Sequence, residues 1–370
     1  MNQWAERLRR VPVVPVLMLA VGLVVTLAAV GIGTGPLNSS VDAAVKLLDD
    51  PNNPGRVRGY HLTAPLGLLC VAAACGSIGS LVVGNRMAFF SDAMAHTAMA
   101  GVTAALLGMV FLAGVKTTDD AEKYRWTIPL VMAGIGSAIG LVIAVIQDLT
   151  ALSSDTVIGV FFALALGFAG LMLPALQQKL SVPLEEILFG QLLMLRDEKL
   201  LMVIAMAVAT LAIVAVGYNQ FLLGSFNPSL ANSRGLPVRW NNYLFVVLLA
   251  VVVNLSVYAV GVLLINALLV VPAAAAANVS GNVRRMFWVT FLGSIGCALL
   301  GYQMSASTQI ALGNLTLTPG PSGAVVLVCV GWFFVSLVVR AIRKRFFGTP
   351  HAHDPATCSH DHEHGQYHSH

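Results

Sequence analysis

Residues 86–101 read RMAFFSDAMAHTAMAG, an apolar stretch in which Asp92 and His96 stand four positions apart. Residues at this spacing lie one above the other on the same face of a helix, so the sequence predicts a carboxylate beside an imidazole. Together they make half of a site for a divalent metal ion of hard to borderline character. If Arg86 marks the cytoplasmic edge of a membrane helix, a rise of about 1.5 Å per residue places His96 roughly 15 Å deep. Ionisable groups at that depth are rare and usually line a pathway.

The composition around this stretch is that of a membrane protein. Of the 370 residues, 57% are hydrophobic and 10% are charged, whereas an ordinary soluble domain is about 25% charged. The net charge of +4 is small, and the basic residues lie at the ends of apolar runs, which points to membrane topology and not to nucleic-acid binding. The five cysteines form no C-x-x-C pair, so neither a disulfide framework nor a zinc finger is predicted.

The apolar runs predict an all-α fold with about nine to ten transmembrane helices and both termini in the cytoplasm. The longest run, residues 242–278, would be roughly 55 Å long as one helix, which is too long for one crossing. Arginines on both sides of this run favour the cytoplasm, so it must cross twice. We expect a break near Gly261 and an end at Pro272. The expected spans are 11–33, 61–84, 86–114, 126–146, 155–176, 200–216, 242–261, 262–272, 286–304 and 323–339.

The chain divides into three expected regions. Residues 1–60 form an extra N-terminal transmembrane helix with an extracytoplasmic loop, 61–345 form the main membrane domain, and 346–370 form a disordered cytoplasmic tail. Within the membrane domain, residues 184–195 are too short to span and favour a surface or partly re-entrant helix. Ser153, Ser154 and Asp155 supply N-cap chemistry for the helix that follows, and Asp155 is expected to be its cap. The histidines of the tail are possible ligands for metal ions. They are His351, His353, His360, His362, His364, His368 and His370.

The motif R-x-x-F-F-x-D-A-x-A-H-x-x-x-x-G at residues 86–101 resembles the permease subunit of the bacterial ATP-binding-cassette (ABC) importers for zinc, manganese and iron. The resemblance covers about residues 62–345 and implies the fold of a type II ABC importer permease. Asn227 and Ser229 stand where that family usually carries acids, which bears on the details of the contact with the ATPase. Five further matches follow in the order of the family, at 155–159, 188–190, 226–231 with Gly235, 261–275 and 319–324.

The resemblance implies roles and partners. Asp92 and His96 would carry the transmembrane metal-binding positions, and residues 219–240 would hold the coupling helix that docks on the ATPase. The implied partners are a cytoplasmic ABC ATPase, an extracytoplasmic metal-binding protein, and a second permease copy or a paralogue, all at the bacterial cytoplasmic membrane. The tail histidines favour zinc as the transported ion, but a carboxylate with an imidazole suits manganese and iron as well. No permanently bound cofactor is expected. The coupling residues are Phe226, Asn227, Pro228, Leu230, Ala231, Arg234 and Gly235.

Other readings of the sequence stay open. Asp92 and His96 could form a polar pair that only fixes helix packing. The chain could also be a permease for iron chelates or corrinoids, or a proton-coupled secondary metal transporter. It carries no G-x-x-x-x-G-K-[ST] motif, so we expect ATP hydrolysis to belong to a partner subunit. Four polar residues could support the metal site from within the membrane, although hydrogen bonds between helices explain each of them more simply. They are Asn254, Ser256, Tyr258 and Asn266.

Overall fold

The structure is a computed structural model of the chain. It describes residues 58–112, 114, 124, 126–150, 152–180, 197–226, 231, 238–307, 310–312, 315–317 and 320–347. The predicted N-terminal helix, the loop that follows it, the short helix at 184–195 and the histidines of the tail lie outside these residues.

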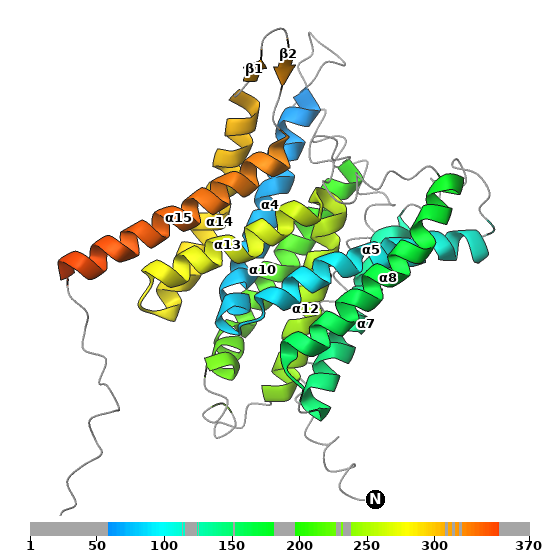
Figure 1. The fold of residues 1–370 in the computed structure, drawn as a ribbon, viewed down its shortest axis with the longest axis horizontal. Coiled ribbons are helices and arrows are strands. Elements are labelled where there is room, and N and C mark those ends of the chain that lie inside the picture. The colour runs from blue at the N-terminus through cyan, green and yellow to red at the C-terminus, as the bar shows by residue number, and fades with distance from the viewer. Residues whose placement is uncertain are drawn as a thin grey trace, which may run out of the picture.

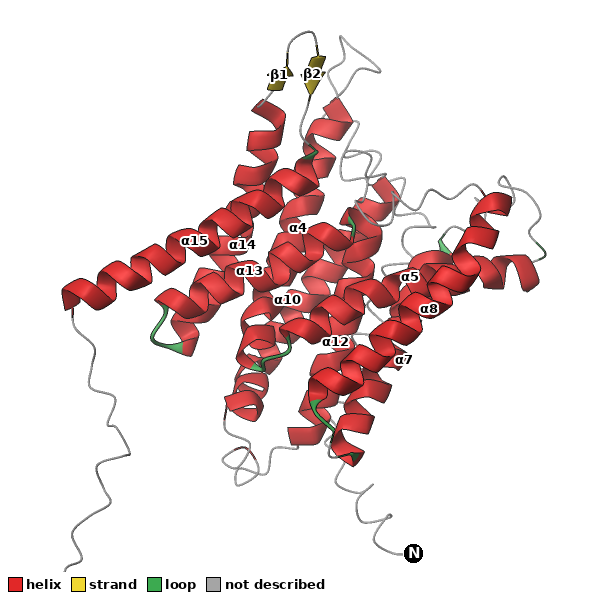
Figure 2. Ribbon diagram, in the orientation of Figure 1, coloured by secondary structure: helices red, strands yellow, loops and turns green. Residues whose placement is uncertain are grey.

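Long α-helices make up almost all of the described part of the chain (Figure 1; Figure 2). Within that part, nine helices are long and apolar enough to cross a membrane. The prediction of an all-α polytopic membrane protein with about nine to ten spans is confirmed. The helices are α4 (Arg58–Gly84), α5 (Ala88–Phe111), α7 (Thr127–Leu149), α8 (Ser154–Leu180), α10 (Asp197–Phe226), α12 (Val238–Val260), α13 (Val262–Val279), α14 (Val283–Ser307) and α15 (Pro321–Phe347).

The long apolar run after residue 241 forms two helices, as predicted, because it breaks at Gly261. Gly261 has a φ of +89°, a conformation that glycine adopts readily and that residues with a Cβ avoid. Its N–H still donates to the carbonyl oxygen of Val257 at 2.8 Å, so the last turn of α12 closes before the chain changes direction. The predicted break is confirmed.

The expected end of the second helix at Pro272 is wrong, because α13 continues through this proline to Val279. Proline has no N–H, so the carbonyl of Leu268, four residues earlier, loses its helical donor. Ser294 of α14 takes over this role, since its Oγ donates to the Leu268 oxygen at 3.2 Å. Serine side chains from neighbouring helices often satisfy such carbonyls in membrane proteins, which lets the helix continue.

Helix α10 is longer than predicted. The predicted spans end at residue 216 and resume at 242, but α10 runs to Phe226 and α12 already begins at Val238. The ring of Tyr218 packs edge-on against Phe287 of α14, with the ring centroids 4.7 Å apart. Packing of this aromatic side chain, and not the polarity of its neighbours, extends the helix.

The prediction that Asp155 caps α8 is wrong. The cap is Ser153, whose Oγ accepts a hydrogen bond from the backbone N–H of Thr156 at 3.3 Å. Asp155 lies one position later than the first helical residue, Ser154, and is exposed in the first turn. There its negative charge favours the positive end of the helix dipole.

A short β-hairpin lies between α14 and α15 in the chain, which we did not expect. Its strands, β1 (Ile310–Leu312) and β2 (Leu315–Leu317), are antiparallel, with Ala311 opposite Thr316. The sequence places Gly-Asn between them, and such dipeptides favour tight hairpin turns. The signal for this hairpin was therefore present in the sequence.

Close helix contacts bring α5 and α13 into position. In Figure 1, α5 and α13 cross obliquely over the more upright α4, α10 and α12, and α13 contacts both α4 and α5. A Cβ added at Gly79 of α4 would overlap the carbonyl oxygen of Leu269 in α13. A Cβ added at Gly101 of α5 would lie 2.8 Å from the Cα of Met132 in α7. Small residues let membrane helices approach this closely, and they fix the two helices that carry the candidate site.

Candidate metal site

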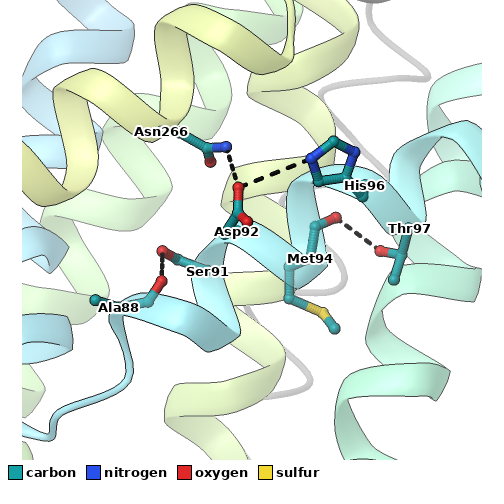
Figure 3. A network of polar contacts seen from close by, with 7 residues as sticks. All are labelled: Ala88, Ser91, Asp92, Met94, His96, Thr97 and Asn266. Carbon is teal, nitrogen blue, oxygen red and sulfur yellow. Dashed lines mark hydrogen bonds and ion pairs between the residues drawn. The ribbon is translucent and has the colours of Figure 1, made fainter. Parts of the chain in front are cut away.

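Asp92 and His96 lie side by side near the start of α5 (Figure 3). The chain leaves α4 at Gly84 and enters α5 at Ala88, through a tight turn in which Arg86 has a φ of +57°. Asp92 therefore falls in the second turn of α5, and His96 follows one turn later. The two side chains share one face of the helix, as the spacing of four residues requires.

The distance between the two side chains suits two donors that share an ion. Nε2 of His96 lies 3.8 Å from Oδ1 of Asp92, which is too long for a hydrogen bond. Transition-metal ions hold nitrogen and oxygen ligands at about 2.0–2.2 Å, so two neighbouring donors of one ion lie roughly 3.0–3.5 Å apart. The side chains of His96 and Asp92 are 26% and 41% exposed, so an ion can reach both after a small adjustment.

Asn266 of α13 completes a polar triad with this pair. Its Nδ2 donates a hydrogen bond to Oδ1 of Asp92 at 2.5 Å, between residues that are 174 positions apart in the chain. Figure 3 shows the Asp92 carboxylate between the Asn266 amide and the His96 imidazole. The sequence marks Asn266 as a polar residue in an apolar run, but only the tertiary contact of α13 with α5 brings it to Asp92.

The imidazole of His96 has room to act as a ligand. Within the described part of the chain, its Nδ1 is buried and has no hydrogen-bond partner, and its Nε2 faces Asp92. The ring packs edge-on against Phe162 of α8, with centroids 5.1 Å apart and an interplanar angle of 85°. This contact holds the plane of the imidazole, while both nitrogens keep their capacity to bind.

The hydroxyl groups next to the pair on α5 do not face it. Oγ of Ser91 donates to the carbonyl oxygen of Ala88, and Oγ1 of Thr97 donates to that of Met94, both at 2.7 Å. Such bonds to the preceding turn are common for serine and threonine inside helices. Asp92, His96 and Asn266 are therefore the side chains from which a site would be built.

The other three polar candidates have contacts away from the pair. Nδ2 of Asn254 donates to the carbonyl oxygen of Ala250 in its own helix at 2.8 Å. Oγ of Ser256 lies 3.5 Å from Sδ of Met206. The ring of Tyr258 lies under a lysine ammonium group of α10. Their positions fit helix packing.

The donors in the described part of the chain do not fill a coordination shell. The described residues contain no cluster of three or more His, Cys, Asp or Glu side chains. Asp92, His96 and Asn266 offer three donors at most, whereas transition-metal ions usually take four to six. A complete site needs water, or donors from beyond the described part of this chain or from another subunit.

The expected coupling region lies at the junction of α10 and α12. Phe226 is the last residue of α10, and Ala231 is helical and fully buried. Close by in the sequence, the hydroxyl of Tyr243 donates to Oδ2 of Asp148 at 2.6 Å and ties the start of α12 to the end of α7. The remaining coupling residues, outside the described part, are Asn227, Pro228, Leu230, Arg234 and Gly235.

A comparison with known protein families shows to which family the chain belongs. A profile of the ABC 3 transport family matches residues 60–340. The chain belongs to the ABC 3 transport family. The resemblance carried by the six sequence motifs is thereby confirmed, and the apolar helices are those of a multi-pass membrane permease.

Relatives of this ABC 3 permease match over most of their length. It is 29% identical over 281 residues to the manganese transport system membrane protein MntC of Listeria innocua, covering 76% of this chain and 90% of the relative. It is 27% identical over 296 residues to the manganese import system permease protein ScaB of Streptococcus gordonii, covering 78% of this chain and 98% of the relative.

A solved structure shares the fold of this ABC 3 permease. PsaBC from Streptococcus pneumoniae in complex with Fab aligns with a TM-score of 0.60 and 23% sequence identity, covering 75% of this chain and 91% of the matched chain. The alignment covers about the same share of the chain as the family profile, so the helical core as a whole follows the fold of a known permease.

Proposed function

We propose that this permease carries a divalent transition-metal ion from an extracytoplasmic binding protein into the cytoplasm, through a site that contains Asp92 and His96. The observation that carries the proposal is the paired carboxylate and imidazole, 3.8 Å apart and partly exposed on a helix of an apolar bundle. Ionisable groups in membrane helices are costly to bury and usually serve a pathway for ions or substrates.

Manganese is the first ion to test. The sequence alone favoured zinc because of the histidine-rich tail, which lies outside the described residues. The relatives from Listeria and Streptococcus are named for manganese, and a site with a carboxylate and an imidazole suits manganese, iron and zinc. The names of the relatives therefore shift the proposal toward manganese and give no support to a preference for zinc.

A second permease copy, or a paralogue, would supply the missing donors. The described residues of one chain offer Asp92, His96 and the Asn266 amide, which are too few for a full shell. The side chain of Asp92 is 41% exposed in the single chain, and an exposed carboxylate facing lipid would be unfavourable. A neighbouring subunit that covers this face would both shield the carboxylate and add ligands.

The energy for transport would come from a separate ABC ATPase. The chain has no P-loop motif with which to bind ATP. The junction of α10 and α12 would dock on the separate ATPase. In the proposed orientation, both termini and residues 219–240 lie on the cytoplasmic side of the bacterial inner membrane, because the flanking arginines favour that side. Closure of the ATPase pair would then open the site inward.

Uptake into proteoliposomes tests this function. The permease is reconstituted with its ATPase subunit and binding protein, and uptake of Mn²⁺, Zn²⁺ and Fe²⁺ is measured singly and in competition. We expect ATP-dependent uptake of free ions, with Mn²⁺ the best competitor. Transport of an intact iron chelate or corrinoid would favour the chelate permease. Uptake driven by a proton gradient without the ATPase would favour a secondary transporter. Either result contradicts the proposal.

A further inference from the structure

Asn266 bonds to Asp92 of the candidate metal site through only one of its two amide atoms. Its Nδ2 donates to Oδ1 of Asp92, while its own Oδ1 is buried without a hydrogen-bond partner within the described part of the chain. A buried amide oxygen that accepts no hydrogen bond carries a free-energy cost. This oxygen lies on the same amide that touches Asp92, so an ion bound by the carboxylate would arrive within its reach.

We propose that Asn266 is a ligand of the transported ion and that it biases the site toward manganese. The proposal rests on the transport function assigned to Asp92 and His96. In the ion-free site the amide donates through Nδ2 and steadies the carboxylate. When an ion binds, a half-turn about χ2 exchanges the two amide atoms and presents Oδ1 to the ion. This terminal torsion is broad and has two nearly equivalent settings, so the half-turn needs no change in the backbone.

The number and type of donors give the bias its physical basis. Two chains that each supply Asp92 and His96 offer two oxygens and two nitrogens, a set that fits the tetrahedral preference of zinc. With Asn266 the same two chains offer four oxygens and two nitrogens. Six donors dominated by oxygen suit a harder ion with six-fold coordination, such as Mn²⁺, better than they suit Zn²⁺. Asn266 therefore favours the larger coordination number.

The position of Asn266 fits such a role. It lies in the second turn of α13, one turn after the break at Gly261, and Gly79 allows the close approach of α13 to α4. The backbone around the amide is therefore held, and the proposed half-turn involves only the terminal torsion of the side chain. A ligand that alternates between Asp92 and the ion also keeps binding reversible, which transport requires.

The test is metal binding to the assembled permease and ATPase complex in lipid nanodiscs. Bound Mn²⁺ is followed by electron paramagnetic resonance, and Zn²⁺ is added from a chelator buffer that fixes its free concentration. Buffering removes the effect of zinc taken up by the tail histidines. The variants are Asn266→Leu, which keeps the approximate shape but removes both polar atoms, and Asn266→Asp, which keeps an oxygen donor but removes the N–H.

The matched control is Asn254→Leu. Asn254 is a buried asparagine of α12 whose Oδ1 also has no partner in the described residues, but whose Nδ2 bonds within its own helix and not to Asp92. We expect Asn266→Leu to lower Mn²⁺ affinity by at least about tenfold and to change Zn²⁺ affinity much less. The ratio of Mn²⁺ affinity to Zn²⁺ affinity should therefore fall. Asn266→Asp should bind Mn²⁺ at least as tightly as the unmodified chain and release it more slowly. Asn254→Leu should leave the ratio of the two affinities unchanged.

A purely positioning role gives a different pattern and would overturn the proposal. In that case Asn266→Leu weakens both ions equally, because both need Asp92, and Asn266→Asp is as damaging as Asn266→Leu. If Asn266→Leu does not assemble, the Mn²⁺ affinity of Asn266→Asp still separates the two roles. Failure of the transport function itself looks different again, since the unmodified complex would then bind neither ion, or Asp92→Asn would have no effect.

Discussion

Two contacts between membrane helices each hold an asparagine, and the two asparagines differ in what they bond to. At the contact of α5 with α13, Asn266 donates to the carboxylate of Asp92 on another helix. At the contact of α7 with α12, Asn254 donates to a carbonyl of its own helix and is fully buried, with Gly136 of α7 packed directly against its amide. A polar residue in a membrane helix is therefore not by itself a sign of a transport site.

The difference lies in charge and access. The α5–α13 contact contains a carboxylate and an imidazole that are both partly exposed, and a buried imidazole nitrogen without a partner in the described residues. At the α7–α12 contact, Gly136 packs against the Asn254 amide. Oδ1 of Asn254 is also buried without a partner in the described residues, but its Nδ2 bonds to a carbonyl of its own helix and not to a carboxylate. The first arrangement can exchange an ion with its surroundings, and the second can only hold two helices together.

The largest effect is expected at the first contact. Asp92→Asn and His96→Ala should each lower metal uptake by more than about a hundredfold, beyond the loss typical of groups that merely orient a ligand. Thermal stability and ATPase binding should stay near those of the unmodified chain, because both side chains are partly exposed and α5 keeps its wider packing against α7 and α8. The measurement is uptake of Mn²⁺ into proteoliposomes, with melting of the purified complex followed in parallel.

The matched control for Asp92→Asn is Asp155→Asn, which removes an exposed carboxylate from the first turn of α8. It should transport at the normal rate. Normal uptake by both Asp92→Asn and His96→Ala would show that the pair only fixes helix packing, and the contrast between the two contacts would disappear.

Substitutions at the α7–α12 contact should change the stability of the permease through packing. A Cβ added at Gly136 would overlap the Asn254 amide, so Gly136→Ala should destabilise the permease by about 1–3 kcal/mol, the usual cost of overpacking. Gly134→Ala, on the same helix, is the control, because a Cβ there meets nothing within 4 Å. Denaturation in mixed micelles gives the free energy of unfolding. An equal loss in both variants would mean that helix flexibility, and not the Asn254 contact, explains the glycine.

Sequence reasoning found the features whose cause is local. The spacing of Asp92 and His96 along one helix, the break at Gly261 and the apolar spans all depend on residues close together in the chain, and each is recovered in the structure. The hairpin after α14 was missed although its turn signal is local, but the other missed features depend on distant partners. Nothing near Asn266 in the sequence reveals that α5 passes beside it, and so its contact with Asp92 could not be predicted.

The two corrected helix ends have the same explanation. Pro272 normally signals the end of a helix, but Ser294 from α14 satisfies the carbonyl that the proline leaves free. The segment after Tyr218 looks polar in sequence, but Phe287 from α14 packs against that tyrosine. In both places a neighbouring helix outweighs the local preference, and only the tertiary structure shows which neighbour is present.

A smaller effect is expected at Ser294. Ser294→Ala removes the donor to the Leu268 carbonyl, which Pro272 cannot satisfy, and this should lower the free energy of unfolding by about 1 kcal/mol, the typical net value of one hydrogen bond. Uptake should change little, because Asp92 and Asn266 keep their contact. Ser307→Ala is the control, since Ser307 is exposed and bonds within its own helix. If Ser294→Ala were as stable as the control, another group would have to satisfy the carbonyl.

The smallest effect is expected from the histidine-rich tail, which tests whether metal ligands outside the membrane matter for transport. The seven histidines between residues 351 and 370 can bind zinc through imidazole, but they follow the membrane domain in the chain and lie outside the described residues. Deleting 351–370 should therefore leave the rate of Mn²⁺ uptake close to that of the full chain, because Asp92, His96 and Asn266 are all retained. A chain of full length in which the seven histidines are replaced by glutamine separates the imidazoles from the length of the tail. Loss of uptake in both variants would show that the ion must pass through the tail ligands, and transport would then depend on more than the pathway between α5 and α13.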